Sequence, residues 1–341
     1  MIAAALLAAL ALTGSARAAE VQRARVLMGT VLTAVVEAPD TVAAAAAIDS
    51  AFDEVARLER VMSSWRGDNE LSRLNAAGLE PFRCSPDLYA VLDSALALAR
   101  DTGGAFDPMV EPLMRAWDVR GAGRVPSAAE RGAARALVDW HGLALDARAR
   151  TARLERAGMG VDLGGIGKGY ALDRVLARLR AARVAEALVD FGGQVAVLTR
   201  SERAIAIADP GDRLRAIVTL PLANGSASTS AQSEHGFTRR GRRYGHIVDP
   251  RTGAPVATRA SVTVVCASAT RADALSTALL VMGRAGAAGW GRDHPEDGVL
   301  WLEPHAGRVR AWTWNLAPAE IAGAVAWMND ARQSNLMKGA P

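Results

Sequence analysis

Four short β-prone runs follow one another between residues 185 and 231, and this feature limits the possible folds more than any other. The runs read AEALVDFGGQVAVLT, RAIAIADP, RAIVTLPL and GSASTSA. Short runs at this regular spacing predict an antiparallel or mixed sheet. Two more β-prone runs flank Met28-Gly29-Thr30, and helical patterns stand between the groups of strands. Helices inserted among sheet strands favour an α+β architecture.

Apolar side chains at helical spacing predict the main helices. The run from Ile48 to Met62 has one apolar face and predicts an amphipathic helix. Ser85, followed by a proline, predicts the N-cap of a second helix. Residues 271–282 predict a third helix, which Gly283 would close. Residues 121–160 are rich in Ala, Arg and Gly and predict no clear element.

The first 18 residues have the pattern of an export signal. An apolar run is followed by small residues and by Ala16-Arg17-Ala18, an A-x-A pattern that suits signal peptidase. The alternative is a buried N-terminal helix, because no basic residue precedes the apolar run. The run is about 11 residues, and a membrane span needs about 20. We therefore expect a signal peptide at 1–18, one domain at 19–335, a tail at 336–341 and a periplasmic location.

Charge and cysteine content exclude several classes of protein. The net charge of +4 is spread along the chain, and no dense basic tract is interleaved with aromatic residues, so a nucleic-acid partner is not expected. The two cysteines, Cys84 and Cys266, lack neighbouring metal ligands and are interpreted as structural or free thiols. Lys168 is unusual, because almost every basic residue of this chain is an arginine.

Lys168 lies in a glycine-rich segment, DLGGIGKGYALD, which predicts a strand up to Leu163, a loop and then a helix. Such a loop lets a ligand approach the backbone, and a helix N-terminus attracts phosphate. The spacing matches neither a P-loop nor a dinucleotide fingerprint, so a plain tight turn is an equal alternative. Asp162, at the end of the predicted strand, favours a role in binding a base, a ribose or a cation.

A second motif, TRADALSTALLVMG, places Asp273 and Thr277 four residues apart on one helical face. One carboxylate and one hydroxyl form a sparse oxygen site, which Mg²⁺ accepts when water and phosphates complete its octahedron. The alternative is a helix-start aspartate beside a solvated threonine.

A third motif, HIVDPRTG, is a strong turn sequence that begins with His246. Asp249 either caps the turn or orients the histidine. His246 is either an ordinary histidine of the core or surface, or a proton acceptor beside a phosphorylated substrate.

Taken in order, seven blocks of the chain resemble the FAD:protein FMN transferase family, also called the ApbE flavin transferases. The blocks are Met28-Gly29-Thr30, MSSWRGDNELSRLN, GGAFDPMVEPLMRAW, VDLGGIGKGYALD, LVDFGGQVAV, YGHIVDPRTGAPV and SVTVVCASATRADALSTALLVMG. The resemblance implies a single-domain α+β fold with a mixed or antiparallel sheet and flanking helices. It also implies an enzyme that binds FAD and Mg²⁺, transfers FMN through its phosphate to a threonine of a target protein, and releases AMP.

The resemblance assigns roles residue by residue. The metal ligands fall on Asp273, Thr277 and the carbonyl of Gly165, the proton acceptor on His246, and a supporting role on Asp249. The FAD contacts fall on Met28, Trp65, Ala105, Phe106, Asp107, Asp162, Lys168 and Val248. Trp65 stands where the family often has tyrosine, and the block STSAQSEHGFTRRG departs from the family pattern, so the conformation of that loop stays open.

Two other functions share these residues. An FAD pyrophosphatase would use water in place of the threonine, and a non-catalytic flavin-binding assembly factor would need no turnover. For the transferase, the expected partner is a subunit of a membrane-associated redox complex, so the chain would meet a membrane only through that partner.

Overall fold

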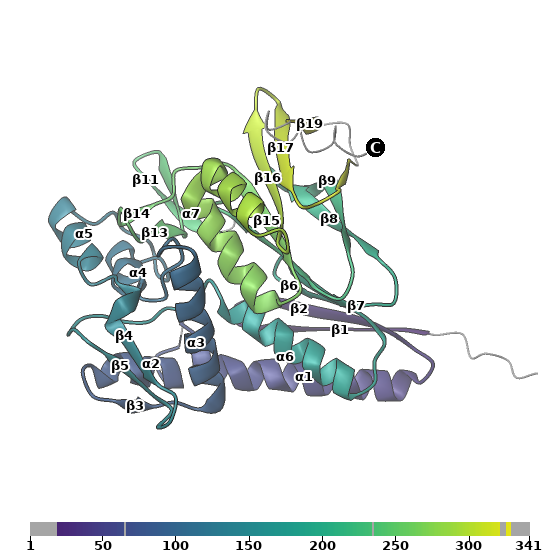
Figure 1. The fold of residues 1–341 in the computed structure, drawn as a ribbon, viewed down its shortest axis with the longest axis horizontal. Coiled ribbons are helices and arrows are strands. Elements are labelled where there is room, and N and C mark those ends of the chain that lie inside the picture. Colours follow the sequence, from purple (N-terminus) through teal and green to yellow (C-terminus); the bar gives the residue numbers. More distant parts are fainter. Residues whose placement is uncertain (1–18, 65, 234, 321–324, 329–341) are drawn as a thin grey trace, which may run out of the picture.

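The fold is built around a nine-stranded sheet, shown in a computed structural model that describes residues 19–64, 66–233, 235–320 and 325–328 (Figure 1). Every neighbouring pair is antiparallel except the last, which is parallel. In spatial order the strands are β1 (Ala19–Leu27), β2 (Thr30–Ala38), β6 (Glu186–Phe191), β7 (Gln194–Leu198), β10 (Ser226–Ala231), β15 (Ser261–Cys266), β16 (Gly298–His305), β17 (Arg308–Trp314) and β19 (Val325–Trp327).

The first two strands form a hairpin with a two-residue turn. Met28 and Gly29 both have positive φ angles, 47° and 76°. Two positive φ values in succession define the turn that matches the right-handed twist of paired strands. The β-prone runs predicted on either side of Met28-Gly29-Thr30 are therefore the two arms of one hairpin.

Three long helices cover one face of the sheet: α1 (Thr41–Met62), α6 (Gly167–Ala181) and α7 (Ala269–Asp293). They lie side by side in the order α1, α6, α7 (Figure 1). Their apolar stripes and the facing strands form the main core, in which Ile48, Phe52 and Leu172 are almost fully buried. A helix packed on a sheet in this way buries one stripe and leaves the other in water.

A smaller sheet of β8 (Arg203–Asp209), β9 (Asp212–Leu222) and β18 (Ala319–Glu320) belongs to a second core. Its inward residues Ile205 and Val218 cluster with Val197 and Leu300 from the large sheet. The middle of the large sheet is therefore covered by helices on one face and by strands on the other.

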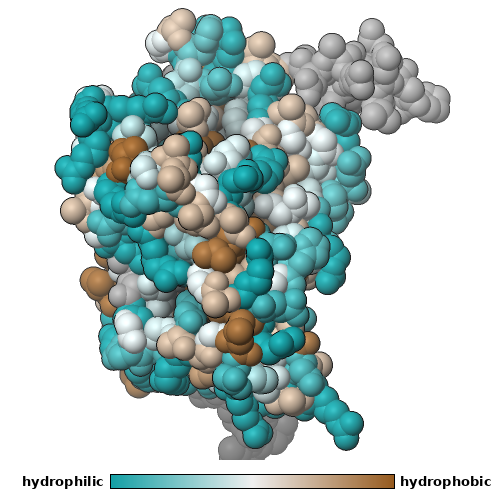
Figure 2. Space-filling view, turned by 90° about the vertical axis from the view of Figure 1, so that its left-hand side faces the viewer, coloured by the Kyte–Doolittle hydropathy of each residue, from teal (hydrophilic) through white to brown (hydrophobic). Residues whose placement is uncertain are grey.

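The remaining elements gather beside the helix layer, on the left of Figure 1. The helices are α2 (Glu70–Ala77), α3 (Pro86–Asp101), α4 (Glu111–Trp117), α5 (Ala128–Arg135) and the 3₁₀ turn η1 (Trp140–Gly142). The strands are β3 (Phe82–Arg83), β4 (Leu143–Asp146), β5 (Thr151–Leu154), β11 (Gly236–Arg239), β12 (Arg242–Gly245), β13 (Val248–Asp249) and β14 (Ala254–Pro255). The surface on this side is largely hydrophilic, with small, separated hydrophobic patches (Figure 2).

Local helix signals were predicted well. The side chain of Ser85 accepts a hydrogen bond from the Leu88 N–H, so it caps α3 as expected. Gly283 does leave the helical conformation, with φ 73° and ψ 177°, but a second helical stretch follows directly and continues to Asp293. The prediction that Gly283 closes the helix is therefore correct only for its first part. Residues 121–160, for which nothing was predicted, contain α5, η1, β4 and β5.

The strand predicted up to Leu163 is wrong. The chain there is extended, but its backbone pairs with other groups: Val161 exchanges two hydrogen bonds with the side chain of Asn75, and the Asp162 N–H donates to the Pro108 carbonyl. A side-chain amide occupies the place of a neighbouring strand, and no ladder forms.

The α+β fold class is confirmed. Cys84 and Cys266 are free and buried, in agreement with their interpretation as thiols. Within the ranges that the structure describes, no helix is both long and apolar enough to cross a membrane. The expected signal peptide at 1–18 and the tail at 336–341 lie outside those ranges.

Candidate active site

The N-termini of α6 and α7 meet beneath the large sheet, and their junction fixes the position of Asp273. The Gly169 N–H of α6 donates to Asp273 Oδ2 of α7 at 2.9 Å. Asp173 of α6 accepts hydrogen bonds from the N–H groups of Ala269 and Thr270 at 2.8 and 2.9 Å, so it caps the start of α7. The two helices therefore hold each other through the first two turns of α6 and the first two turns of α7.

Gly169 is the contact point of this junction. A Cβ atom at this position would lie 2.2 Å from the Ala269 carbonyl oxygen and 2.8 Å from Asp273 Cβ. Real Cβ atoms do not approach backbone so closely, so only glycine allows the helices to come this near.

Beside this junction is a cavity of about 470 Å³, a size typical of small-molecule sites. Its walls come from segments that are far apart in sequence. They include Met28, Ala105, Phe106, Asp107, Arg120, Asp162, Gly165, Lys168, Gln194, Arg213, Ser230, His235, His246, Val248, Asp273 and Thr277.

The structure thus brings together all but two of the residues singled out from the sequence. Met28 comes from the β1–β2 turn, Ala105 and Phe106 from the segment before α4, and Val248 from β13. Asp249 is not part of the cavity wall, and Trp65 lies outside the described residues. Sequence reasoning missed the charged or polar wall residues Arg120, Gln194, Arg213, Ser230 and His235.

Lys168 and the start of α6 form the candidate anion-binding part of the cavity. Ile166 is the N-cap and gives no side-chain hydrogen bond, and the side-chain acceptor in this turn is Asp273 of α7, which takes the Gly169 N–H. Gly165, Gly167 and Lys168 all line the cavity. The N–H groups of Gly167 and Gly169 already donate to the Leu163 carbonyl and to Asp273, so the Lys168 ammonium group and the positive end of the helix dipole are the features that favour phosphate there.

Asp273, Thr277 and Gly165 form the candidate cation site. Asp273 is 4 % exposed, and its second oxygen, Oδ1, accepts no hydrogen bond from any residue that the structure describes. A Cβ on Gly165 would lie 3.3 Å from Thr277 Oγ1, so the glycine loop reaches the threonine hydroxyl. A carboxylate, a hydroxyl and a carbonyl are hard oxygen donors, which fit Mg²⁺. Among the described residues there is no group of three His, Cys, Asp or Glu that could hold a metal ion.

His246 faces the cavity as a neutral base. Its Nδ1 lies 3.4 Å from the His235 carbonyl oxygen, and the two imidazole rings are edge to face at 5.4 Å. Because a carbonyl only accepts, this contact favours a proton on Nδ1 and leaves Nε2 as the acceptor. Burial lowers the pKa of His246 to about 4, and the nearby charges of His235, Lys168 and Arg243 act in the same direction.

Asp249 supports the turn and not the histidine. Its Oδ1 accepts from the Arg251 N–H at 2.9 Å and from Arg251 Nε at 3.0 Å, and Oδ2 accepts from the same guanidinium. Asp249 was expected either to cap the turn or to orient His246, and these contacts correspond to capping the turn.

Asp107 and Asp162 are buried acids of the cavity wall. Asp107 accepts from the Met109 and Trp140 N–H groups, and burial raises its pKa to about 6. Asp162 Oδ1 accepts from the Gly164 N–H at 2.6 Å, and Oδ2 pairs with Arg120. Asp162 is therefore tied to the glycine loop, where the sequence placed it, and also to an arginine that the sequence did not connect with it.

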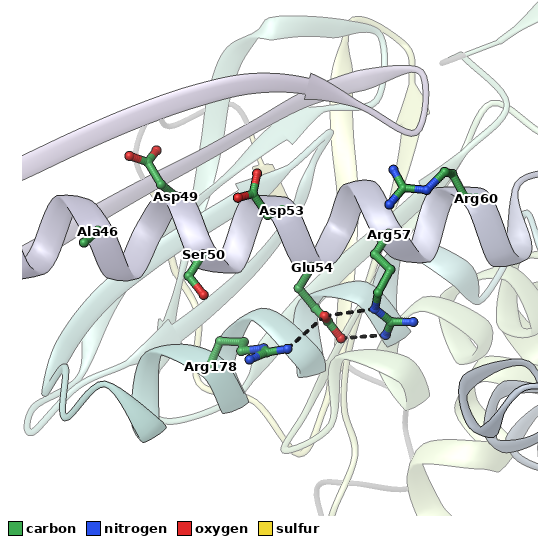
Figure 3. Close-up of a pocket in the computed structure, with 8 residues that line it drawn as sticks. All are labelled: Ala46, Asp49, Ser50, Asp53, Glu54, Arg57, Arg60 and Arg178. Atoms are coloured by element: carbon green, nitrogen blue, oxygen red, sulfur yellow. Dashed lines mark hydrogen bonds and ion pairs between the residues drawn. The ribbon is translucent and has the colours of Figure 1, made fainter.

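A second hollow lies over α1 and α6 and is wide open (Figure 3). In its floor Glu54, 4 % exposed, accepts hydrogen bonds from Arg57 and Arg178, and these bonds lower the pKa of Glu54 to about 2. The opposite charges compensate one another across the two helices, and this ion network ties α1 to α6.

The protein therefore belongs to a class with an α+β fold and one cavity that combines a glycine loop, two adjoining helix N-termini and a candidate cation site with oxygen ligands. The ApbE family model matches residues 28–300. A FAD:protein FMN transferase from Treponema pallidum is 34 % identical, with 87 % of this chain and 88 % of the relative covered. The crystal structure of the ApbE protein from Thermotoga maritima superposes with a TM-score of 0.77 at 27 % identity, covering 89 % and 98 % of the two chains. Flavin transferase ApbE from Vibrio cholerae gives a TM-score of 0.72 at 27 % identity, covering 87 % and 97 %.

The chain belongs to the ApbE family. The family resemblance, the fold class and the assignment to the transferase class of enzymes are thereby confirmed.

Proposed function

We propose that the protein is an Mg²⁺-dependent FAD:protein FMN transferase that modifies a threonine of an acceptor protein. The observation that supports this best is the shared cavity. It contains an anion-binding helix start at Lys168, a buried carboxylate with one oxygen unused at Asp273, and a neutral base at His246. A pyrophosphate, a cation and a hydroxyl nucleophile need these three kinds of group in one place.

In this proposal a bond forms between the threonine oxygen and the phosphorus of the FMN moiety. The pyrophosphate bond breaks at the same phosphorus, and AMP leaves with the bonding electrons. Lys168, at the positive end of the α6 dipole, binds the phosphates. Bound at Asp273, Thr277 and the Gly165 carbonyl, Mg²⁺ would supply neutralisation of the pyrophosphate charge.

His246 takes the threonine proton through Nε2. A base with a low pKa is weak, but phosphoryl transfer has a loose transition state in which the nucleophile needs little deprotonation beforehand. The role of His246 is then to hold the hydroxyl in line and to accept its proton as the new bond forms.

The same site could hydrolyse FAD with water as the nucleophile. The test is incubation of the purified protein with FAD and Mg²⁺, with and without a candidate acceptor subunit. Covalent flavin on a threonine of the acceptor, found by mass spectrometry in equal amounts to the AMP released, supports transfer. Free FMN and AMP with an unlabelled acceptor would instead establish a pyrophosphatase. Binding of FAD with no AMP in either case would indicate a non-catalytic flavin carrier.

The proposed setting is the periplasm, and the proposed acceptor is a subunit of a membrane-associated redox complex. The export pattern of residues 1–18 supports the first. Fractionation of cells that express the full chain tests it, because a signal peptide predicts a periplasmic product shortened by about 18 residues at its N-terminus.

A further inference from the structure

Arg120 lies in the wall of the active-site cavity and joins two carboxylates. Its guanidinium donates to Glu111 Oε1 at 3.2 Å and to Glu111 Oε2 at 2.5 Å, and it also donates to Asp162 Oδ2. The side chains of Asp162 and Glu111 are 5 % and 12 % exposed, and that of Arg120 is 21 % exposed. This arginine is therefore shared by two acids withdrawn from water, and Glu111 has a second cation in Arg115, whose Nε lies 3.5 Å from Oε1.

The contact continues from Asp162 into the glycine loop. The oxygen that Arg120 leaves free, Oδ1, accepts the Gly164 N–H at 2.6 Å. The next residue, Gly165, packs against Thr277 and Phe106, and a Cβ there would lie 3.3 Å from an atom of each. A series of hydrogen bonds thus runs from Arg120 through Asp162 to the Gly164 N–H, one residue before the proposed carbonyl ligand Gly165.

The hydrogen bond between Asp162 and the glycine loop depends on the positive charge of Arg120. Burial raises the pKa of Glu111, and Arg120 opposes that rise. Burial also disfavours the charge of Arg120, but the two carboxylates outweigh it and raise the pKa of the guanidinium. Without Arg120, Asp162 would lose the guanidinium that holds its Oδ2, and two buried carboxylates would face each other with only Arg115 beside Glu111. If Asp162 turned, the Gly164 N–H would lose its acceptor.

We propose that Arg120 is a positioning residue for the cation site. By holding Asp162 in one orientation, it fixes the Leu163–Gly164 peptide through the Gly164 N–H, and this restricts the conformation of the loop that carries the Gly165 carbonyl. This inference rests on the proposed function, because it takes the loop carbonyl as part of an Mg²⁺ site. Partners that orient metal ligands in this way typically change metal affinity 10- to 100-fold when they are removed.

The experiment is an Mn²⁺ titration followed by EPR in the presence of ADP, which supplies a pyrophosphate without a flavin. The variants are Glu111→Gln, Arg120→Lys, and the double change Arg120→Gln with Glu111→Gln. The double change keeps the net charge of the cluster, so it avoids the cost of two unpaired acids. Glu111→Gln is the matched control, because it leaves the pair between Arg120 and Asp162 in place. Thermal melting of each variant reports the fold separately.

We expect unchanged Mn²⁺ affinity for Glu111→Gln and affinity at least tenfold weaker for the double variant, at a melting temperature close to that of Glu111→Gln. Arg120→Lys should fall between them, because an ammonium group keeps the charge but cannot form the planar fork. Wild-type affinity in the double variant would overturn the inference and leave the proposed function intact. A wild-type protein that transfers FMN but binds no Mn²⁺ would also overturn it. A wild-type protein that neither transfers FMN nor binds Mn²⁺ would overturn both this inference and the proposed function.

Discussion

The depressed pKa of His246 leads to a prediction about how activity depends on pH. Burial and the neighbouring cationic groups lower that pKa from 6.5 to about 4, a shift that corresponds to about 3.4 kcal/mol between the two protonation states. At pH 5.5 a histidine with a pKa of about 4 is about 97 % neutral, whereas one with an ordinary pKa is only about 9 % neutral. The proposed base should therefore stay competent far below neutral pH.

The assay is kcat/KM for FAD between pH 4 and pH 8 with saturating Mg²⁺ and acceptor, since this parameter reports the free enzyme. We expect no loss of rate assignable to His246 until the pH approaches 4. His235→Asn is a useful companion, because it removes a nearby charge and should move the acid limb toward higher pH. An acid limb near pH 6.5 in the wild type would show that the histidine is fully solvated, and the assignment of a neutral base with a depressed pKa would fail.

The same shift has a consequence for stability that does not depend on activity. The unfolded chain binds a proton at His246 below about pH 6.5, but the folded chain does so only near pH 4. The folded state is therefore favoured above pH 6.5, and it loses up to about 3.4 kcal/mol as the pH falls from 6.5 to 4. In urea titrations at several pH values, the free energy of unfolding of His246→Asn should lack this part of the pH dependence. An equal fall in the free energy of unfolding between pH 6.5 and pH 4 in the variant and the wild type would contradict the argument.

Three further predictions concern other parts of the fold. Asp273→Asn keeps the shape of the side chain but removes its charge, so we expect AMP release to fall at least about 100-fold with little change in melting temperature; turnover near the wild-type rate would exclude the cation site. Gly169→Ala places a Cβ 2.2 Å from the Ala269 carbonyl oxygen, so the junction of α6 and α7 must open; Mn²⁺ affinity and melting temperature should fall together, and a variant that behaves as the wild type would show that the junction is soft. Glu54→Gln should cost about 2 kcal/mol at pH 7, less than the pKa shift to about 2 alone implies, because its arginine partners are 40–51 % exposed; the difference from wild type in urea titrations should be complete above pH 4.5 and vanish as the pH falls to about 2, and a difference that persists there would have a cause other than this charge.

Local signals in the sequence predicted the elements that depend on neighbouring residues. The β1–β2 hairpin follows from Met28-Gly29 between two β-prone runs, and α3 follows from a serine cap before a proline. Asp273 and Thr277 were placed on one face because helical spacing alone determines it. Each of these features is complete within about a dozen residues, so the pattern of residues was sufficient.

Features that depend on tertiary contacts could not be predicted in the same way. The extended segment before the glycine loop has the pattern of a strand, but its partner is the side chain of Asn75, 86 residues away. Arg120 stands just before a stretch with no clear pattern, and only the fold brings it to Asp162, 42 positions later. Nothing near either residue in the sequence marks the pairing. Asp249 was placed correctly in its turn, but the choice of Arg251 over His246 as partner is a matter of side-chain geometry.

The wall of the cavity draws on residues from Met28 in the first hairpin to Thr277 in α7. Because the site is distributed in this way, no short fragment of the chain contains all of its residues. No fragment much shorter than the span from the first strand to the last long helix can retain all of its groups, so truncation and domain shuffling should remove activity as a whole. New specificity can arise more easily through changes in the loops between the helices and strands, since such a change alters one part of the cavity wall and leaves the other parts in place. We therefore expect members of this family to differ in surface loops and to agree in the order of their elements.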